Sequence, residues 1–336
     1  MLLFRATAQR GRKDKEREET AHGRRGVYTR SRDTDDVATI VVMGAGAVGG
    51  YFGACLQRAG HDVTLVARGT NLEAMQVRGV HVTGAMGDYV VSPRTTGDPS
   101  EAGRCDLVLL CVKNYDLDEA AKAVRGIGDV VLTLQNGVDA PRRAREVLGD
   151  VVLAGATGIV ADLAEPGRVD VVSAYAWIRY GEPDGGGVSE RVGRVASWLG
   201  VDGIEPIAVD DARVALWEKM TLMCGMAGLT TLCQRPMGEI LGDPSLREAF
   251  ELILRECETV ARARGVPLPD DFVDVRLRYA ERIDPTAMSS MSRDFARGRS
   301  IELDTFNGAI VRMGAELGVD VPQNAAVYDG IRAELK

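Results

Sequence analysis

The sequence predicts a doubly wound α/β domain with a mostly parallel sheet, followed by an all-α C-terminal domain. Three observations support this fold class: a glycine-rich turn between two apolar segments, an alternation of short apolar runs with helical patterns as far as residue 206, and long helical patterns beyond it. A chain of 336 residues is also long for one hydrophobic core. We therefore expect a sheet domain over 38–206 and a helical domain over 207–336.

The first 37 residues differ from the rest of the chain. They carry many charges of both signs and few apolar residues, so they cannot bury enough surface to offset the entropy of becoming ordered. We expect residues 1–37 to form a disordered, dispensable arm. Their acidic residues are atypical of transit peptides, which avoid them.

The glycine-rich turn has the sequence GAGAVGG and lies between a β-branched strand pattern and an Ala-rich and Leu-rich helical pattern. Gly44 permits a tight turn, Gly46 lets a pyrophosphate approach the backbone, and Gly49 lets the helix pack closely on its strand. The first amides of the helix, those of Ala47 and Val48 among them, would face the phosphates. This spacing, with strands on both sides, predicts a Rossmann dinucleotide-binding site; the alternative is a turn whose small residues serve packing alone.

The end of the second strand indicates which dinucleotide binds. Sites for NAD usually place Asp or Glu about 20 residues after the first glycine, where the carboxylate binds the ribose 2′-hydroxyl, whereas an arginine suits a 2′-phosphate. Here Arg68 follows the strand, and Asp62 precedes it at the far end. We therefore expect NADPH as the cofactor, with Arg68 on its 2′-phosphate; the alternative is a solvated surface arginine.

Two further apolar runs carry polar residues at their ends. CDLVLLCVK ends in Lys113, and DVVLTLQNG contains Asn136. Because ligands bind outside the carboxyl ends of the strands in such sheets, we expect Lys113 and Asn136 on the same rim as the turn at Gly44.

The second domain opens with the segment DDARVALWEKMTLMCGMAGLTTL. Its acidic start and its apolar residues on nearly all sides predict a long helix at the centre of that domain, with a cleft between the two domains. Lys219 lies in this helix. A buried ammonium is costly, so such a lysine shifts its pKa or finds a partner. The alternative is a lysine whose stem packs while its ammonium reaches water.

Composition narrows the function classes. A net charge of −8 gives no general attraction for nucleic acid, and no apolar run reaches the length needed to span a membrane. The cysteines lack metal-ligand spacing, so no metal site is expected, and their apolar surroundings indicate buried thiols in a reducing cytoplasm. They stand at positions 55, 105, 111, 224, 233 and 257.

From residue 38 to its C-terminus the chain resembles the ketopantoate reductase (2-dehydropantoate 2-reductase) family. The segments GAGAVGGYFGACL, CVKNYD, TLQNGV, LWEKM and SSMSRDFARGRSIELDTFNG carry the resemblance, in this order and with these spacings. The resemblance implies a Rossmann domain followed by a helical domain, and reduction of a 2-oxo acid by NADPH, which for ketopantoate itself belongs to pantothenate biosynthesis.

The resemblance also implies roles for individual residues. Lys219 matches the general acid, Glu302 a substrate-binding carboxylate near it, and Ser290 a contact to the substrate carboxylate. Asn136 and Lys113 match residues on the nicotinamide and substrate side of the cleft. The chemistry agrees, because hydride arriving at a ketone creates an alkoxide that needs a proton donor, and a lysine with an ordinary pKa of about 10.4 stays charged.

Two positions depart from the family. Where ketopantoate reductases carry Asn four and eight residues after the lysine, this chain has Met223 and Ala227, on the same face of the helix. Both positions are expected to line the substrate site. Their change removes polar contacts to the substrate but not the proton donor, which suggests a paralogue with another 2-oxo acid.

Three functions remain open. The first is an NADPH-dependent 2-oxo acid reductase, with ketopantoate as the favoured substrate. The second is an opine-type dehydrogenase that condenses an amino acid with a 2-oxo acid, and the third is a non-catalytic NADP(H)-binding sensor. The pair of Lys219 and Glu302 argues against the sensor, and the WEK segment with Ser290 and Glu302 argues against the opine enzyme. The long helices of the second domain could support a homodimer.

Overall fold

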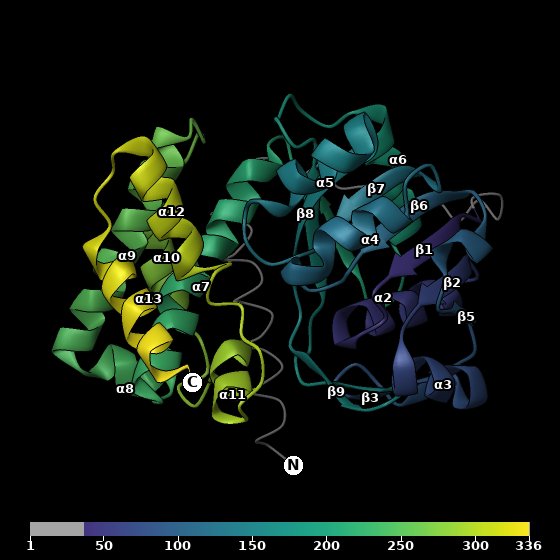
Figure 1. The fold of residues 1–336 in the computed structure, drawn as a ribbon, viewed down its shortest axis with the longest axis horizontal. Coiled ribbons are helices and arrows are strands. Elements are labelled where there is room, and N and C mark those ends of the chain that lie inside the picture. Colours follow the sequence, from purple (N-terminus) through teal and green to yellow (C-terminus); the bar gives the residue numbers. More distant parts are fainter. Residues whose placement is uncertain (1–36, 336) are drawn as a thin grey trace, which may run out of the picture. The chain divides into compact units, whose positions relative to one another are not determined.

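The computed structural model describes residues 37–335, which belong to one compact unit of the chain. The arm expected over 1–37 therefore lies outside the described residues, except for the exposed Val37. Figure 1 shows a sheet with its helices, formed by the described chain up to residue 208, and a group of helices formed by the residues from 212 onward.

The main sheet has eight strands in the order β12-β11-β8-β7-β6-β1-β2-β5. All neighbouring pairs are parallel except β8 and β11, which run antiparallel. This confirms the doubly wound, mostly parallel sheet expected from the sequence. The strands are β1 (Thr39–Met43), β2 (Asp62–Val66), β5 (Arg94–Thr96), β6 (Cys105–Leu110), β7 (Gly128–Thr133), β8 (Val152–Gly158), β11 (Trp177–Gly181) and β12 (Glu205–Ala208).

Helices cover both faces of this sheet because successive strand residues point to opposite sides. In β1, Ile40 and Val42 join the apolar cluster of α2 and α6, whereas Val41 and Met43 join that of α4 and α5. The helices are α2 (Ala47–Arg58), α3 (Gly69–Arg78), α4 (Leu117–Ala123), α5 (Ala140–Leu148) and α6 (Glu190–Leu199), with 3₁₀ turns at Pro99–Ala102, Asn114–Asp116 and Gly149–Val151.

A second, four-stranded sheet packs against α2 on one side of the main sheet. Its order is β4-β3-β10-β9, with β3 and β10 parallel and the outer pairs antiparallel. The strands are β3 (Val80–Gly84), β4 (Tyr89–Val91), β9 (Ala161–Glu165) and β10 (Arg168–Val171).

After β12 the described chain is helical. The central helix α7 (Ala212–Cys233) begins where the Asp211 side chain accepts a hydrogen bond from the Arg213 amide, and it ends at Gln234 in the left-handed region. It packs on α9, α11 and α13 and also on β8 and β11. The other helices are α8 (Met237–Gly242), α9 (Pro244–Ala263), α10 (Phe272–Ala280), α11 (Ser290–Ala296), α12 (Asn307–Leu317) and α13 (Pro322–Glu334).

The change from strands to helices falls between Ala208, which ends β12, and Ala212, which begins α7. The division into two domains at 206/207 stays a prediction, because the described residues form a single compact unit. Ala154 and Ala156 of β8 pack on Ala212 and Leu216 of α7, so a small apolar cluster joins the sheet to the helices. Within residues 37–335, no helix combines the length and apolar character needed to cross a membrane.

Candidate functional site

The glycine-rich turn has the geometry that its three glycines suggest. Gly44 has a φ of +101°, and a Cβ there would lie 2.7 Å from the amide nitrogen of Val112. A Cβ on Gly49 would lie 2.3 Å from the carbonyl oxygen of Gly44, so the helix could not approach the turn as closely. Around Gly46, by contrast, a Cβ would meet no atom within 4 Å. The backbone of Gly46 therefore faces open space, as a pyrophosphate site requires.

The start of α2 fits the same role. Gly46 caps this helix without a side-chain hydrogen bond, and Ala47 and Val48 form its first turn with Gly49. Helix amides in that position are good donors to a phosphate group. The sequence did not reveal Asn71, whose Nδ2 donates to the Ala45 carbonyl oxygen at 2.8 Å and so braces the turn. No local pattern predicts this contact, because 26 residues separate the two partners.

Arg68 lies at the expected end of the second strand. It directly precedes α3, two residues after β2 ends, whereas Asp62 begins β2 at the opposite edge. The Arg68 side chain is 65% exposed and its nearest carboxylate, that of Glu119, is 3.8 Å away. An exposed ion pair of this length is weak, so the guanidinium is available to another anion.

At the rim of the sheet, three residues form a hydrogen-bonded chain. Lys219 Nζ donates to Asn136 Oδ1 at 2.8 Å, and Asn136 Nδ2 donates to Glu302 Oε2 at 3.0 Å. Lys219 comes from α7, Asn136 follows β7, and Glu302 precedes α12. The structure thus brings together residues that are 83 and 166 positions apart in the chain.

Lys113 joins this group from the end of β6. Its Nζ lies 3.4 Å from the same Glu302 Oε2 that accepts from Asn136. The Glu302 side chain is only 9% exposed, whereas that of Lys113 is 50% exposed. A nearly buried carboxylate thus has one amide and one ammonium partner, which offset the cost of its burial.

The ammonium of Lys219 is perturbed. Removal from water lowers the pKa of Lys219 to about 8, and the negative charge of Glu302 opposes this shift. The ordinary lysine pKa expected from the sequence is therefore too high for this site. An ammonium with a pKa near neutrality releases its proton more readily than an ordinary lysine, which suits a general acid.

The side chains of the other residues expected to contact the substrate make no described hydrogen bond to those of Lys219, Asn136 or Glu302. Ser290 is the exposed first residue of α11, and no described hydrogen bond joins it to the three residues above. Its neighbour Ser289 is buried and accepts from Thr230 Oγ1 of α7 at 3.0 Å, which ties α11 to the central helix. Met223 is partly buried against the helical core, and Ala227 is fully buried in it.

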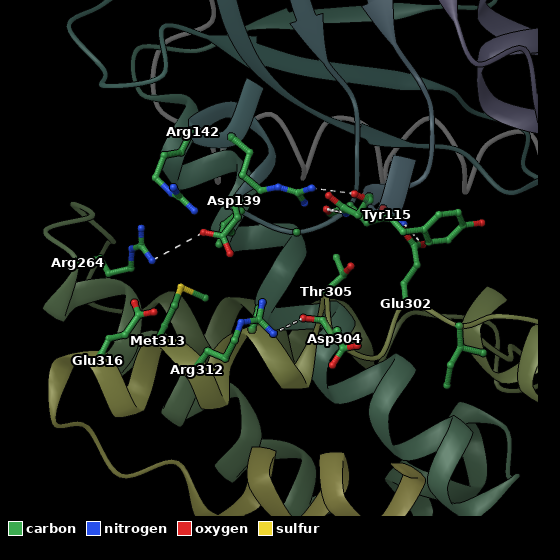
Figure 2. A pocket seen from close by; sticks show the side chains of 17 residues that line it. Tyr115, Asp139, Arg142, Arg264, Glu302, Asp304, Thr305, Arg312, Met313 and Glu316 are labelled. Atoms are coloured by element: carbon green, nitrogen blue, oxygen red, sulfur yellow. Dashed lines mark hydrogen bonds and ion pairs between the residues drawn. The ribbon is translucent and has the colours of Figure 1, made fainter. Parts of the chain in front are cut away.

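A hollow of about 740 Å³ lies beside these hydrogen-bonded residues, and Asn136 and Glu302 form part of its wall. Figure 2 shows arginine and carboxylate side chains on its other walls, with Met313 between them. The charged lining residues are Asp139, Arg142, Arg143, Arg264, Glu302, Asp304, Arg312 and Glu316. Its lining residues come both from the part of the chain that forms the sheet and from the helical part, as expected for the cleft predicted between the two, but the sequence did not predict which charged side chains line it. Among the described residues, no group of His, Cys, Asp and Glu is arranged to hold a metal ion.

Comparisons with known proteins give a consistent result. The model of the family described as ketopantoate reductase PanE/ApbA matches residues 40–185, and the model of its C-terminal part matches residues 211–334. The chain is 33% identical to a 2-dehydropantoate 2-reductase of Archaeoglobus fulgidus over 301 residues, which cover 88% of this chain and 97% of the relative. It is 32% identical to a 2-dehydropantoate 2-reductase of Caulobacter vibrioides, over 87% of this chain and 97% of that one.

Solved structures with a similar fold include a member of the same family. A crystal structure of a PanE/ApbA family ketopantoate reductase from Ralstonia eutropha matches with a TM-score of 0.80 and 34% identity, over 88% of this chain and 97% of that one. A ternary structure of D-mandelate dehydrogenase with NADH and anilino(oxo)acetate also matches with a TM-score of 0.80, over 88% of this chain and 98% of that one. Its 21% identity shows a shared fold only.

Proposed function

The chain belongs to the ketopantoate reductase family of oxidoreductases, and from that premise we propose that it reduces the ketone of a 2-oxo acid with NADPH. The observation that carries the proposal is the hydrogen-bonded chain from Lys219 through Asn136 to Glu302. It supplies a proton donor at the rim of the sheet that also carries the glycine-rich turn. The relatives named 2-dehydropantoate 2-reductase support the same reaction class.

In this proposal Lys219 is the general acid. A bound reduced nicotinamide supplies the hydride. The negative charge that develops on the ketone oxygen is stabilised by the Lys219 ammonium, which then donates its proton to that oxygen. Its pKa of about 8 keeps it mostly protonated at neutral pH while making the proton easy to release. Asn136 orients the ammonium, and Glu302 limits the loss of its charge.

Lys113 and Arg68 are proposed to bind anionic groups. Lys113 balances the charge of Glu302 and is exposed enough to meet a cofactor or substrate as well. Arg68 is proposed to bind the 2′-phosphate, which makes NADPH the preferred cofactor over NADH. The open backbone at Gly46 and the first amides of α2, at Ala47, are proposed to hold the pyrophosphate.

The substrate is proposed to be a small 2-oxo acid. Family membership makes ketopantoate the first candidate, because the relatives are named for it, whereas Met223 and Ala227 favour a 2-oxo acid without its hydroxyl group. Met223 lies four residues after Lys219 on α7, so the tail of the substrate is proposed to meet a thioether there. Ser290 is proposed to bind the substrate carboxylate, which requires the exposed start of α11 to face the bound substrate.

The test is NADPH oxidation against a panel of 2-oxo acids, each with and without an added amine, with Lys219→Ala as the control. Turnover that needs no amine and disappears in Lys219→Ala supports the reductase. Turnover only with an amine points to the opine-type reaction. If the protein binds NADPH but turns over no 2-oxo acid, the proposal is overturned, and the result favours a non-catalytic NADP(H)-binding sensor.

A further inference from the structure

Gln135 connects the ends of two neighbouring strands. Its Nε2 donates to the carbonyl oxygen of Leu110 at 2.9 Å and to that of Val112 at 3.2 Å. Leu110 is the last residue of β6, and Gln135 follows β7 by two positions. The Gln135 side chain is buried, with a residue exposure of 4%. One carboxamide therefore fixes two backbone positions, one at the end of β6 and one just beyond it.

The positions that it fixes lie next to site residues on both sides. Val112 directly precedes Lys113, and Gln135 directly precedes Asn136. Lys113 and Asn136 reach the same oxygen, Oε2 of Glu302. The spacing between the two strand ends therefore decides whether both side chains meet Glu302 together.

The same segment also touches the glycine-rich turn. The amide nitrogen of Val112 is so close to Gly44 that a Cβ on that glycine would approach it to 2.7 Å. A displacement of Val112 would therefore also disturb the glycine-rich turn, which is proposed to hold the pyrophosphate. Asn114 adds a second tie, because its Nδ2 donates to the carbonyl oxygen of Asn136.

Gln135 is a poor choice if its only purpose is packing. Its Oε1 is buried and has no hydrogen-bond partner among the described residues. A buried acceptor without a partner costs stability, and an apolar side chain of similar length would avoid that cost. The value of the residue thus lies in the two bonds that its Nε2 makes.

We propose that Gln135 is a positioning residue, which sets the gap between the ends of β6 and β7 so that Lys113 and Asn136 converge on Glu302. The proposal rests on the reductase function proposed above. It does not give Gln135 any contact with the substrate. Asn136 also accepts a hydrogen bond from Lys219, so the alignment of the proton donor depends on Gln135 as well.

The test compares Gln135→Met with Thr133→Val. Methionine keeps the length of the side chain and removes the donor. Thr133, the last residue of β7, is the control, because its buried Oγ1 donates to the Leu153 carbonyl oxygen of β8 at 3.1 Å and not to the segment that follows β6. We expect kcat to fall about ten- to hundredfold in Gln135→Met, as it does when a catalytic group is misplaced, together with a lower thermal midpoint. In Thr133→Val we expect a lower midpoint and a kcat within about twofold of wild type.

A second measurement does not depend on turnover. Amide hydrogen exchange of the segment 111–116 should accelerate in Gln135→Met and stay unchanged in Thr133→Val. The amides to follow are those of Cys111 and Asp116, which bond to the carbonyl oxygens of Met43 and Lys113. If Gln135→Met fails to fold, Gln135→Glu serves instead. Its buried carboxyl can donate only while protonated, so kcat should fall as pH rises, with a titration that wild type lacks.

Each outcome decides the proposal. Unchanged kcat and unchanged exchange in Gln135→Met, or a kcat in Gln135→Glu that follows the wild-type pH profile, overturns the positioning role. An equal loss of kcat in Thr133→Val shows that any buried bond of β7 matters, which also overturns it. If wild type turns over no 2-oxo acid, the reductase function fails, and the exchange experiment still tests the alignment of the segment.

Discussion

The ammonium of Lys219 and the carboxamide oxygen of Asn136 are 2.8 Å apart, although one lies on the central helix and the other follows a strand of the sheet. This bond is charge-assisted, and it fixes the direction of the ammonium. The other end of the same amide donates to Glu302. Asn136 thus links the proposed acid to a carboxylate through its amide. Removal from water lowers the pKa of the ammonium, and the charge of Glu302 opposes this shift.

The first prediction concerns Lys219 as the proton donor. Lys219→Ala should lower kcat by about 10²- to 10⁴-fold, the usual range for a positioned general acid. The dissociation constant for NADPH should stay nearly the same, because the glycine-rich turn is untouched. Single-turnover kinetics together with NADPH titration separate the two effects. A Lys219→Ala enzyme with normal kcat would refute the assignment.

The second prediction concerns the pH dependence of the reduction. The pKa of Lys219 is lowered to about 8 by removal from water, so the proton donor disappears above that pH. We expect kcat/KM for the 2-oxo acid to be level below pH 8 and to fall about tenfold for each further pH unit. A profile that stays level to pH 10 would show that another group donates the proton.

The third prediction concerns stability. The unfolded chain holds the Lys219 proton up to about pH 10.4, whereas the folded chain releases it near pH 8. Between these values the unfolded state binds more protons, so the free energy of unfolding contributed by Lys219 rises with pH. Lys219→Met lacks this contribution.

Its stability relative to wild type should therefore fall between pH 7 and pH 10.5, by at most on the order of 3 kcal/mol. Urea unfolding of both proteins at the two pH values measures the difference, and other titrating groups cancel. A difference that does not change with pH would mean that the lysine is hydrated in the folded protein.

The sequence predicted those parts of the site that depend on local pattern. The glycine-rich turn at Gly44 and the strand-end positions of Lys113 and Asn136 follow from rules about a strand and the helix after it. The mostly parallel sheet follows from the alternation of strand and helix patterns. These features need no knowledge of which distant residues meet.

The remaining features depend on contacts between distant parts of the chain. The contact between Glu302 and Asn136 spans 166 residues, and the family resemblance implied only that Glu302 lies near Lys219. Asn71 and Gln135 donate to backbone carbonyl oxygens. Every residue has such an oxygen, so the sequence does not indicate which one accepts the bond. The pKa of Lys219 depends on how deeply folding removes its ammonium from water, which periodicity does not determine.

The fourth prediction concerns cofactor choice. NADPH should bind more tightly than NADH, and Arg68→Ala should remove most of the difference. A charge-assisted contact to a phosphate is worth about 1.5 to 3 kcal/mol, which is about ten- to hundredfold in affinity. Glu119→Ala is the matched control, because it removes the same ion pair but keeps the guanidinium. It should preserve the preference, and equal affinities for both cofactors in wild type would contradict the role of Arg68.

The fifth prediction concerns the substrate. Ketopantoate carries a hydroxyl group that needs a hydrogen-bond partner, and Met223 and Ala227 offer none. Each lost amide contact should cost about 0.5 to 1.5 kcal/mol, and more where the hydroxyl is buried without a partner. A 2-oxo acid with an apolar branched or aromatic tail should instead gain from contact with Met223, whose flexible thioether adapts to irregular shapes. We therefore expect kcat/KM to be higher for such acids than for ketopantoate.

Met223→Asn tests the cause of this preference. A carboxamide at that position should raise kcat/KM for ketopantoate relative to acids that lack the hydroxyl. Ala227 is a less suitable position, because it is fully buried in the helical core and a larger polar residue there would disturb packing. Leu222→Asn is the control, since Leu222 is a partly buried neighbour that points elsewhere around the helix. If wild type prefers ketopantoate by about a hundredfold, a free-energy difference of about 2.7 kcal/mol, the apolar residues at these positions do not restrict the substrate.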